Sequence, residues 1–309
     1  MCAAFGSWER ITLPPQIVDA HHHFWDLAAV DYPWLMARGV RRFFGDPTPI
    51  QRNYVAVDLR HDAAPVELLQ SVHVQVGCAP GSELAETRWL DQQARHTGLP
   101  SAIVAAVDLT LADVDIQLAA QVAASARVRG VRQIVGREPA DDVRTGAGRV
   151  LVHPNFTRGL RRLAAQDLSF DLQQSVPQLP QVTRLLADTP DLAVALCHGG
   201  SPWDQSVAGL RQWRAGLRQL AALPRVFCKL SGLSMFMPAW QESQYIAIAA
   251  AILDIFGPER VMFGSNYPVD GLHRSYGEIF AASQAAVRPY GEAALDAVFA
   301  ANARSFYRL

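Results

Sequence analysis

Short apolar segments recur along the chain, and each is followed by a longer amphipathic one. The short segments are rich in β-branched residues and apolar on both faces, as parallel strands covered by helices require. Eight segments share this pattern: Ile17–Ala20, Ser71–Val76, Ala102–Val107, Gly130–Val135, Leu168–Leu172, Leu192–Cys197, Val226–Leu230 and Val261–Phe263. The pattern therefore predicts eight parallel strands.

The longer segments carry leucine and alanine at helical spacing, with charged residues on the opposite side. They include Glu83–His96, Asp113–Ala126, Phe156–Gln166, Pro180–Asp188, Val207–Leu220 and Gln244–Phe256. Eight alternating strand and helix units in about 250 residues predict the α/β class and a closed (β/α)8 TIM barrel. An open doubly wound sheet is the alternative, and it is disfavoured because no G-x-G-x-x-G follows an early strand.

One long irregular segment interrupts this alternation. It runs from Phe24 to Ala64 and is rich in Trp, Tyr, Pro and Arg. Because loops of this length in compact domains are usually functional, and this one follows the first strand, we expect it to cover the barrel mouth. We expect residues 1–16 to be an N-terminal extension and all 309 residues to form one domain.

The composition excludes several classes of function. Half of the residues are apolar, 18% are charged and the formal net charge is -1, so no basic surface for nucleic acid or an anionic membrane is expected. No run approaches the ~18 apolar residues of a membrane span. The four cysteines show no CxxC spacing, and we expect a reducing, cytoplasmic compartment. The oligomeric state is not specified by any pattern.

Histidines gather at the end of the first predicted strand, in the segment Ile17–Asp26. Alternate side chains of a strand share a face, so His21 and His23 point the same way while His22 points away. At the carboxyl end of a barrel strand that face looks into the active-site mouth, where two imidazoles can bind one divalent metal ion. A histidine-rich loop without function is the alternative, but the strand spacing favours a functional site.

The segment Asp19–Asp26, followed by Asp31–Leu35, resembles the opening of the amidohydrolase-related barrel enzymes, and more narrowly their sugar-lactonase and 2-pyrone-4,6-dicarboxylate-lactonase branch. Later segments fit in the same order: His73–Val76, Glu86–Leu90, Gly130–Gln133, Phe170–Gln173, Cys197–Gly200, Cys228–Leu233 and Met262–Val269. The resemblance covers Ile17 to the C-terminus. It implies a barrel that hydrolyses lactones or related carbonyl compounds.

The resemblance also implies roles for individual residues. His21 and His23 match the first-strand pair, and His198 matches a histidine that serves as metal ligand or proton shuttle. We therefore expect His21, His23 and His198 to hold one divalent metal, Zn²⁺, with an open position for water. Metal-free catalysis is the alternative, because some relatives in this branch need no metal. His198 would then handle the proton.

At one position the chain departs from the family pattern. The eighth strand usually ends in an Asp that takes a proton from the attacking water, and here that position is Asn266. A neutral amide cannot accept that proton. Asp270 is the nearest carboxylate, and we expect it on the rim of the mouth. Together with His198, Asn266 and Asp270 are the candidate catalytic residues.

Five residues are candidates for substrate binding. Arg132, which matches a substrate-facing residue of the family, could clamp a carboxylate or pair with an acid on the rim. Gln173 could orient the substrate or satisfy a backbone group. Lys229 lies in an otherwise apolar strand, where an unpaired ammonium is costly, so a partner or a site role is expected. Trp25 and Tyr32 follow the first strand and could stack on a ring or anchor the loop.

The leading hypothesis is a hydrolase that opens a lactone of a sugar acid or of an aromatic-degradation intermediate by attack of water on the ester carbonyl. Arg132 and Lys229 would suit a carboxylated or polyhydroxylated small molecule. A metal-dependent decarboxylase of the same superfamily is one alternative, and Asn266 weakens it because that chemistry normally needs an acid at the eighth strand. A non-catalytic ligand-binding barrel is the other alternative.

Overall fold

The computed structural model describes residues 17–64, 66–237 and 239–309, so the expected N-terminal extension lies outside the described residues. Eight strands form one parallel sheet in sequence order: β1 (Ile17–His22), β2 (Leu68–Val74), β3 (Ala102–Ala106), β4 (Val128–Arg132), β5 (Ser169–Leu172), β6 (Val194–Leu196), β7 (Val226–Leu230) and β8 (Val261–Phe263). Each predicted strand lies within two or three residues of an observed one. The predicted (β/α)8 barrel is confirmed.

Strands β1 and β8 close the barrel through the residues at their carboxyl ends. The N–H of Asn266 donates to the carbonyl of His21 at 2.6 Å, and the N–H of His23 donates to the carbonyl of Tyr267 at 2.7 Å. The chain after β8 is therefore held against the two histidines of β1.

Asp19 reinforces this closure from inside the barrel wall. Its fully buried Oδ1 accepts the N–H of His21 at 3.1 Å and the N–H of Ser265 at 2.9 Å. Tyr276 donates its hydroxyl to Oδ2 at 3.3 Å. One carboxylate thus ties β1, the chain after β8 and the following helix together.

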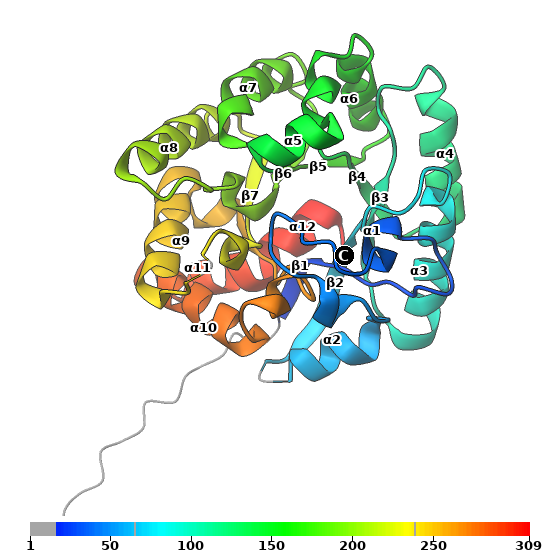
Figure 1. Ribbon diagram of the computed structural model, residues 1–309. Helices are drawn as coiled ribbons and strands as arrows, with labels where there is room; N and C mark the ends of the chain where they lie inside the picture. The colour runs from blue at the N-terminus through cyan, green and yellow to red at the C-terminus, as the bar shows by residue number, and fades with distance from the viewer. Residues whose placement is uncertain (1–16, 65, 238) are drawn as a thin grey trace, which may run out of the picture.

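Helices cover the outside of the barrel (Figure 1). The longer ones are α3 (Glu83–Thr97), α4 (Val114–Ala124), α6 (Phe156–Ala165), α7 (Leu179–Ala187), α8 (Val207–Ala221), α9 (Glu242–Phe256) and α10 (Tyr276–Val287). Helix α3 ends at Gly98, whose φ of 80° is the left-handed conformation that terminates helices and that glycine adopts without strain. Within the described ranges, no helix is long and apolar enough to cross a membrane.

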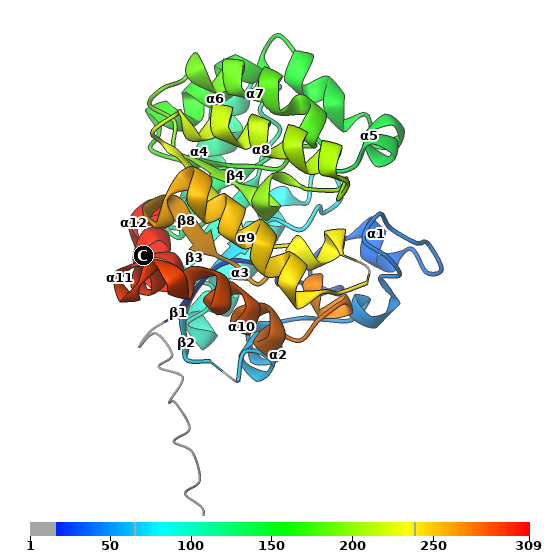
Figure 2. The same cartoon turned by 90° about the vertical axis from the view of Figure 1, so that its left-hand side faces the viewer.

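The amino-terminal end of the barrel is plugged by the last helix, α12 (Asn302–Tyr307), which follows the short helix α11 (Glu292–Asp296). Phe306 and Tyr307 pack against a buried apolar layer inside the barrel that includes Val18, Val72, Val104 and Met262. Figure 2 shows α11 and α12 at the end opposite to the short helices α1 (Pro33–Met36) and α5 (Pro139–Thr145). The carboxyl ends of the strands open toward α1 and α5.

The segment 24–64 is not irregular throughout, because Ala56–Asp62 form helix α2. The backbones of Trp25 and Tyr54 pair in an antiparallel bridge, with N–H to carbonyl distances of 2.9 and 3.0 Å. This bridge closes the base of a long excursion that projects at the open end of the barrel (Figure 2).

Candidate active site

Three histidines gather at the carboxyl ends of β1 and β6. The rings of His21 and His23 have centroids 5.1 Å apart, and the ring of His198 lies 4.7 Å from that of His21. His22 points elsewhere and places Nε2 2.9 Å from the hydroxyl of Ser71. Strand alternation therefore separates His22 from the other two, as the sequence predicted.

The residues after β7 hold the His198 ring in place. His198 has φ of 56°, a left-handed conformation that costs about 1–2 kcal/mol in a residue other than glycine. Its N–H donates to Ser231 Oγ at 3.3 Å, and its Nδ1 lies 3.2 Å from the same oxygen. A Cβ on Gly232 would lie 2.3 Å from His198 Nδ1, so the ring occupies space that only glycine leaves free.

The protonation state of His23 follows from its partners. Nδ1 lies 2.6 Å from the carbonyl of Val74, which can only accept, so Nδ1 carries the proton. Burial, together with the charge of Arg132, lowers the pKa of His23 to about 3. The ring is therefore neutral at physiological pH, and Nε2 is left with a lone pair. Metal-ligating histidines commonly have this arrangement, in which the other ring N–H donates to a carbonyl.

Asp270 lies behind Asn266, and not on the rim of the mouth where the sequence placed it. The N–H of Asp270 donates to the carbonyl of Asn266 at 3.1 Å, and this turn folds the carboxylate back into the protein, where it is fully buried. Asn266 Nδ2 donates to Asp270 Oδ1 at 2.9 Å, while Asn266 Oδ1 lies 3.2 Å from His23 Nε2. Burial raises the pKa of Asp270 to about 7.

The charge of Asp270 decides which atom Asn266 presents to His23. When no metal ion occupies the lone pair of His23 Nε2, that lone pair needs a donor, and Asn266 supplies one when its amide is rotated so that Nδ2 faces the ring. Asn266 Oδ1 then faces Asp270, which must be protonated in order to donate. An ionised Asp270 instead accepts a hydrogen bond from Nδ2 and leaves Oδ1 facing the site. This is the orientation of the amide in the structure.

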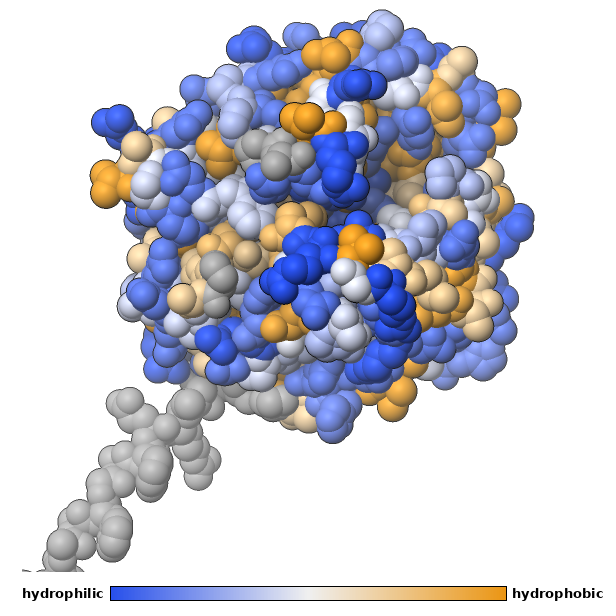
Figure 3. Space-filling model, in the orientation of Figure 1, coloured by the Kyte–Doolittle hydropathy of each residue, from blue (hydrophilic) through white to orange (hydrophobic). Residues whose placement is uncertain are grey.

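A cavity of about 330 Å³ opens above these residues. Its floor is polar and includes His23, Arg132, Gln173, His198 and Asn266, and its walls include Trp25, Trp34, Phe43 and Phe44. The volume lies at the lower end of the range for small-molecule sites, so it suits one small ligand. Figure 3 shows the corresponding hollow near the centre of the face, with strongly hydrophilic residues at its edges.

Arg132 is the principal hydrogen-bond donor of the cavity floor. One amino group donates to Gln173 Oε1 at 3.2 Å, and the other donates to the carbonyl of Gln75. These bonds fix the plane of the guanidinium. Each amino group uses one of its two N–H donors in these bonds, so Arg132 retains donors for a ligand.

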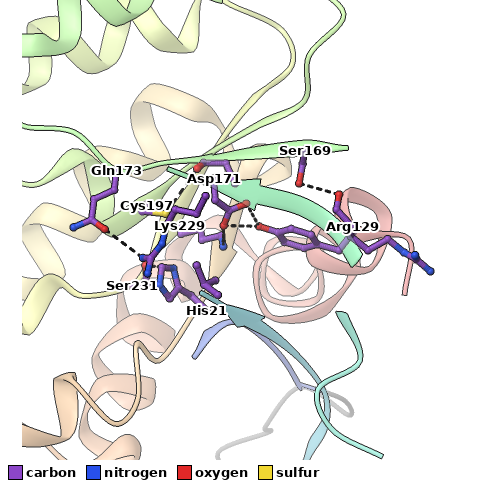
Figure 4. A network of polar contacts seen from close by, with 12 residues as sticks. His21, Arg129, Ser169, Asp171, Gln173, Cys197, Lys229 and Ser231 are labelled. Atoms are coloured by element: carbon purple, nitrogen blue, oxygen red, sulfur yellow. Dashed lines mark hydrogen bonds and ion pairs between the residues drawn. The ribbon is translucent and has the colours of Figure 1, made fainter. Parts of the chain in front are cut away.

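Two of the candidate substrate residues do not line the cavity. Lys229 is fully buried and pairs with Asp171, with Nζ 2.5 Å from Oδ2. Tyr307 donates its hydroxyl to Asp171 Oδ1 at 2.9 Å, and Figure 4 shows this cluster beside His21. Lys229 thus has the partner that the sequence called for, and it acts on the site at a distance: burial lowers the pKa of His21, and the Lys229 charge lowers it further.

The other residue is Tyr32, which donates its hydroxyl to Glu86 Oε1 at 3.0 Å and is fully buried. Trp25 does line the cavity, while its Nε1–H donates to the carbonyl of Arg52 at 2.6 Å.

Asp171 was not among the residues predicted from the sequence. Strand alternation could have identified it, because Asp171 shares a face of its strand with Gln173.

Two sets of side chains are candidates for holding a metal ion. The ligand atoms of His21, Asp171 and Cys197 lie within 4.8 Å of one another. This set does not fit a cation, because the oxygens of Asp171 are already taken by Lys229 and Tyr307 and the ammonium group would repel the ion.

The three histidines suit a metal ion better by their chemistry, although among the described residues their ligand nitrogens do not all lie within 4.8 Å of one another. Among the described residues His21 Nε2 is buried without a hydrogen-bond partner, which is costly unless a ligand satisfies it. Burial lowers the pKa of His198 as well, so all three imidazoles are neutral, the form that binds Zn²⁺.

Known proteins resemble this chain over nearly its whole length. The amidohydrolase family model matches residues 18–309. The chain is 34% identical over 295 residues to the uncharacterised protein y4mH of Sinorhizobium fredii, covering 95% of this chain and 98% of that protein. It is 33% identical over 276 residues to the L-fucono-1,5-lactonase of Burkholderia multivorans, covering 85% of each.

A solved structure supports the same assignment. The crystal structure of an amidohydrolase from Burkholderia multivorans with bound zinc is 31% identical, with a TM-score of 0.78 over 95% of this chain and 99% of that one. The fold, the family match and the relatives agree with one another. The chain belongs to the amidohydrolase family, as a hydrolase related to lactonases.

Proposed function

We propose that this protein opens the lactone of a sugar acid by attack of water on the ester carbonyl. One water is consumed, the acyl carbon–oxygen bond breaks, and a carboxylate, a hydroxyl group and a proton are formed. The observation that carries the proposal is the cavity floor, where neutral imidazoles of His23 and His198 lie beside the donors of Arg132 and Asn266. The relative named as a fuconolactonase supports a sugar-acid substrate.

We further propose that His21, His23 and His198 hold one divalent metal ion. The related amidohydrolase crystal structure contains bound zinc, which supports this proposal. When bound, the metal would act as a Lewis acid that polarises the carbonyl and makes water a better nucleophile at neutral pH. Such a site needs no carboxylate at position 266. The alternative to this proposal is metal-free hydrolysis, in which His198 takes the proton from water, because it is neutral and lines the cavity.

The remaining floor residues orient the substrate. Arg132 can donate a remaining N–H of its amino groups to an oxygen of the ligand, and Gln173 holds the guanidinium in place. With Asp270 protonated, Asn266 presents an N–H toward the site, where negative charge develops on the carbonyl oxygen during attack. Hydrogen-bond donors aimed at that charge stabilise the transition state.

The test is a pH-indicator assay against a panel of γ- and δ-lactones of sugar acids, combined with metal analysis of the purified protein. Acid release above the uncatalysed rate supports a lactonase. Loss of CO₂ from a carboxylic acid without lactone hydrolysis would point to the decarboxylase, and ligand binding without turnover would point to a non-catalytic barrel. Activity in protein shown to contain no metal would refute the metal proposal and leave His198 as the proton acceptor.

We also propose a cytoplasmic location. Among the described residues Cys78, Cys197 and Cys228 are free thiols, and burial raises the pKa of Cys197 to about 12, so it stays protonated. Free thiols are typical of reducing compartments. Fractionation of the native cells would test this location.

A further inference from the structure

The outer part of the cavity is lined by arginines that the proposed hydrolysis does not use. Arg42 belongs to the excursion after β1, whereas Arg137 and Arg144 belong to the segment around α5. Asp141 is the one carboxylate in the cavity lining as described, with Oδ2 3.5 Å from Arg137 Nη1 and Oδ1 2.5 Å from Arg144 Nη2. Cations therefore outnumber anions at this end of the cavity.

Arg42 is held firmly but keeps unused donors. Two backbone hydrogen bonds of 2.7 and 3.0 Å between Arg42 and Gly45 close a tight turn. The guanidinium lies over the ring of Trp34, 5.8 Å from its centroid, and Nη2 donates to the Trp34 carbonyl at 3.2 Å. Within the described residues no hydrogen bond is made by Nη1, so this amino group can donate to a ligand at little cost in side-chain entropy.

Trp203 holds the two arginine-bearing segments together. Its indole N–H donates to the carbonyl of Arg137 at 2.7 Å, and its ring packs edge-on against Phe43 with centroids 5.6 Å apart. Phe43 lies in the same turn as Arg42. The arginines are thus positioned by packing that exists without a ligand, which is the arrangement expected of a preformed binding site.

The arginines also repel one another. Burial lowers the pKa of Arg42, and the charge of Arg144 lowers it further, which places the two groups within electrostatic reach. The neighbouring acids are engaged elsewhere: Glu138 accepts the N–H of Asp141 at 2.9 Å, and Asp142 accepts the N–H of Arg137 at 2.7 Å. An anionic ligand would relieve this repulsion.

We propose that Arg42, Arg137 and Arg144 form a second subsite, which binds a carboxylate on a side arm of the substrate, beyond the lactone ring. The planar forks of arginine suit a carboxylate, and the apolar walls of Trp34 and Phe44 lie in the same cavity and can pack on the carbon skeleton. In Figure 3 strongly hydrophilic residues flank the hollow on the side of α5 and on the side of the excursion. The proposal rests on the proposed lactone hydrolysis and specifies its substrate class as acidic lactones.

The test compares the γ-lactones of glucaric and gluconic acid, which differ by a carboxylate in place of a hydroxymethyl group on the side arm. We expect the wild-type protein to have a higher kcat/KM for the glucaric lactone, mainly through KM. Arg42→Gln and Arg144→Gln should each lower the ratio of the two kcat/KM values by about tenfold, the effect of losing one charge-assisted contact. The Arg144 side chain is 63% exposed, so its replacement leaves the core intact.

Arg41→Gln is the matched control. It removes the same charge from the adjacent position, but Arg41 is exposed and does not line the cavity. The ratio should stay at the wild-type value. An equal fall of the kcat/KM ratio in Arg41→Gln and Arg42→Gln would show a general electrostatic effect and overturn the subsite. An unchanged ratio in Arg42→Gln would also overturn it.

Calorimetric binding of the open-chain acids separates this proposal from the proposed function. Glucarate should bind more tightly than gluconate to wild-type protein, and Arg42→Gln should reduce this preference by about tenfold. That result in a protein that hydrolyses no lactone would refute the hydrolysis and retain the subsite. Equal affinities in the wild-type protein would refute the subsite even if lactones are hydrolysed.

Discussion

Asp270 reaches the active site only through Asn266, and this gives the pair a pH dependence. Protonated Asp270 donates to Asn266 and turns the amide N–H toward the site, whereas ionised Asp270 turns the amide oxygen there. Because burial raises the pKa of Asp270 to about 7, kcat/KM should fall as the pH rises through about 7. In Asp270→Asn the new amide donates permanently to Asn266 Oδ1, so this alkaline limb should disappear.

The control for this prediction is Asp270→Ala, which cannot donate at any pH. Its kcat/KM should be low and flat across the same range, so a general loss of packing can be told apart from a change in protonation. Retention of the wild-type limb in Asp270→Asn would assign that limb to another group.

Asn266→Asp tests the departure from the family pattern directly. The new carboxylate would lie about where the amide oxygen is, 3.2 Å from His23 Nε2, and would face Asp270 at the distance of the present 2.9 Å hydrogen bond. Two carboxylates so close share one proton, and the other becomes an anion and a base. We expect tighter zinc binding and, because the base gained outweighs the amide N–H donor lost, kcat equal to or above the wild-type value. A fall in kcat with unchanged metal content would show that the amide N–H itself is required.

At the scale of elements, the turn after β7 sets the position of the histidine after β6. Gly232→Ala would place Cβ 2.3 Å from His198 Nδ1, at a φ of 64° that is strained for alanine. We expect a loss of about 1–3 kcal/mol in unfolding free energy from the strain and, in addition, a drop in kcat as His198 moves. Gly98→Ala is the control. It has the same backbone strain, at a φ of 80°, but its new Cβ meets no clash because the nearest neighbour atom is 4.0 Å away. Equal activities of the two variants would show that the position of His198 does not matter for catalysis.

The strands were predictable because each is apolar on both faces, a property of a few consecutive residues. The histidine pair was predictable for the same reason, since strand alternation places His21 and His23 together. The buried position of Asp270 was not predictable, because its turn folds inward only in the presence of β1 and the loop after β7. The partnership of Lys229 with Asp171 depends on the register of two strands across the barrel, and sequence could only indicate that a partner was needed.

At the scale of the whole molecule, the excursion after β1 completes the ligand cavity at the open end of the barrel. It supplies Trp25, Trp34 and Arg42 to the cavity, and α12 at the other end supplies the phenol that holds Asp171. The two ends of the barrel thus have separate roles: one binds the ligand, and the other fixes the buried charge of Lys229 beneath the histidines. No local pattern could predict the arginine subsite, because its members come from segments that meet only in the folded protein.

Metal binding should stabilise the whole molecule, because the three histidines converge only when the barrel is folded. A ligand that binds only the folded state, at a hundredfold excess over its Kd, adds about 2.7 kcal/mol to the unfolding free energy. For a chain of this size we expect Zn²⁺ to raise Tm by several degrees, measured by calorimetry on protein first stripped with a chelator.

Stripping the metal should abolish lactone hydrolysis, and Zn²⁺ should restore both activity and Tm. His21→Ala should lose both responses, whereas His61→Ala, which removes an exposed histidine on α2, should keep them. A chelator that changes neither Tm nor activity would show that the histidines act without a metal, and the pKa of His198 should then govern the acid limb of the kcat/KM profile.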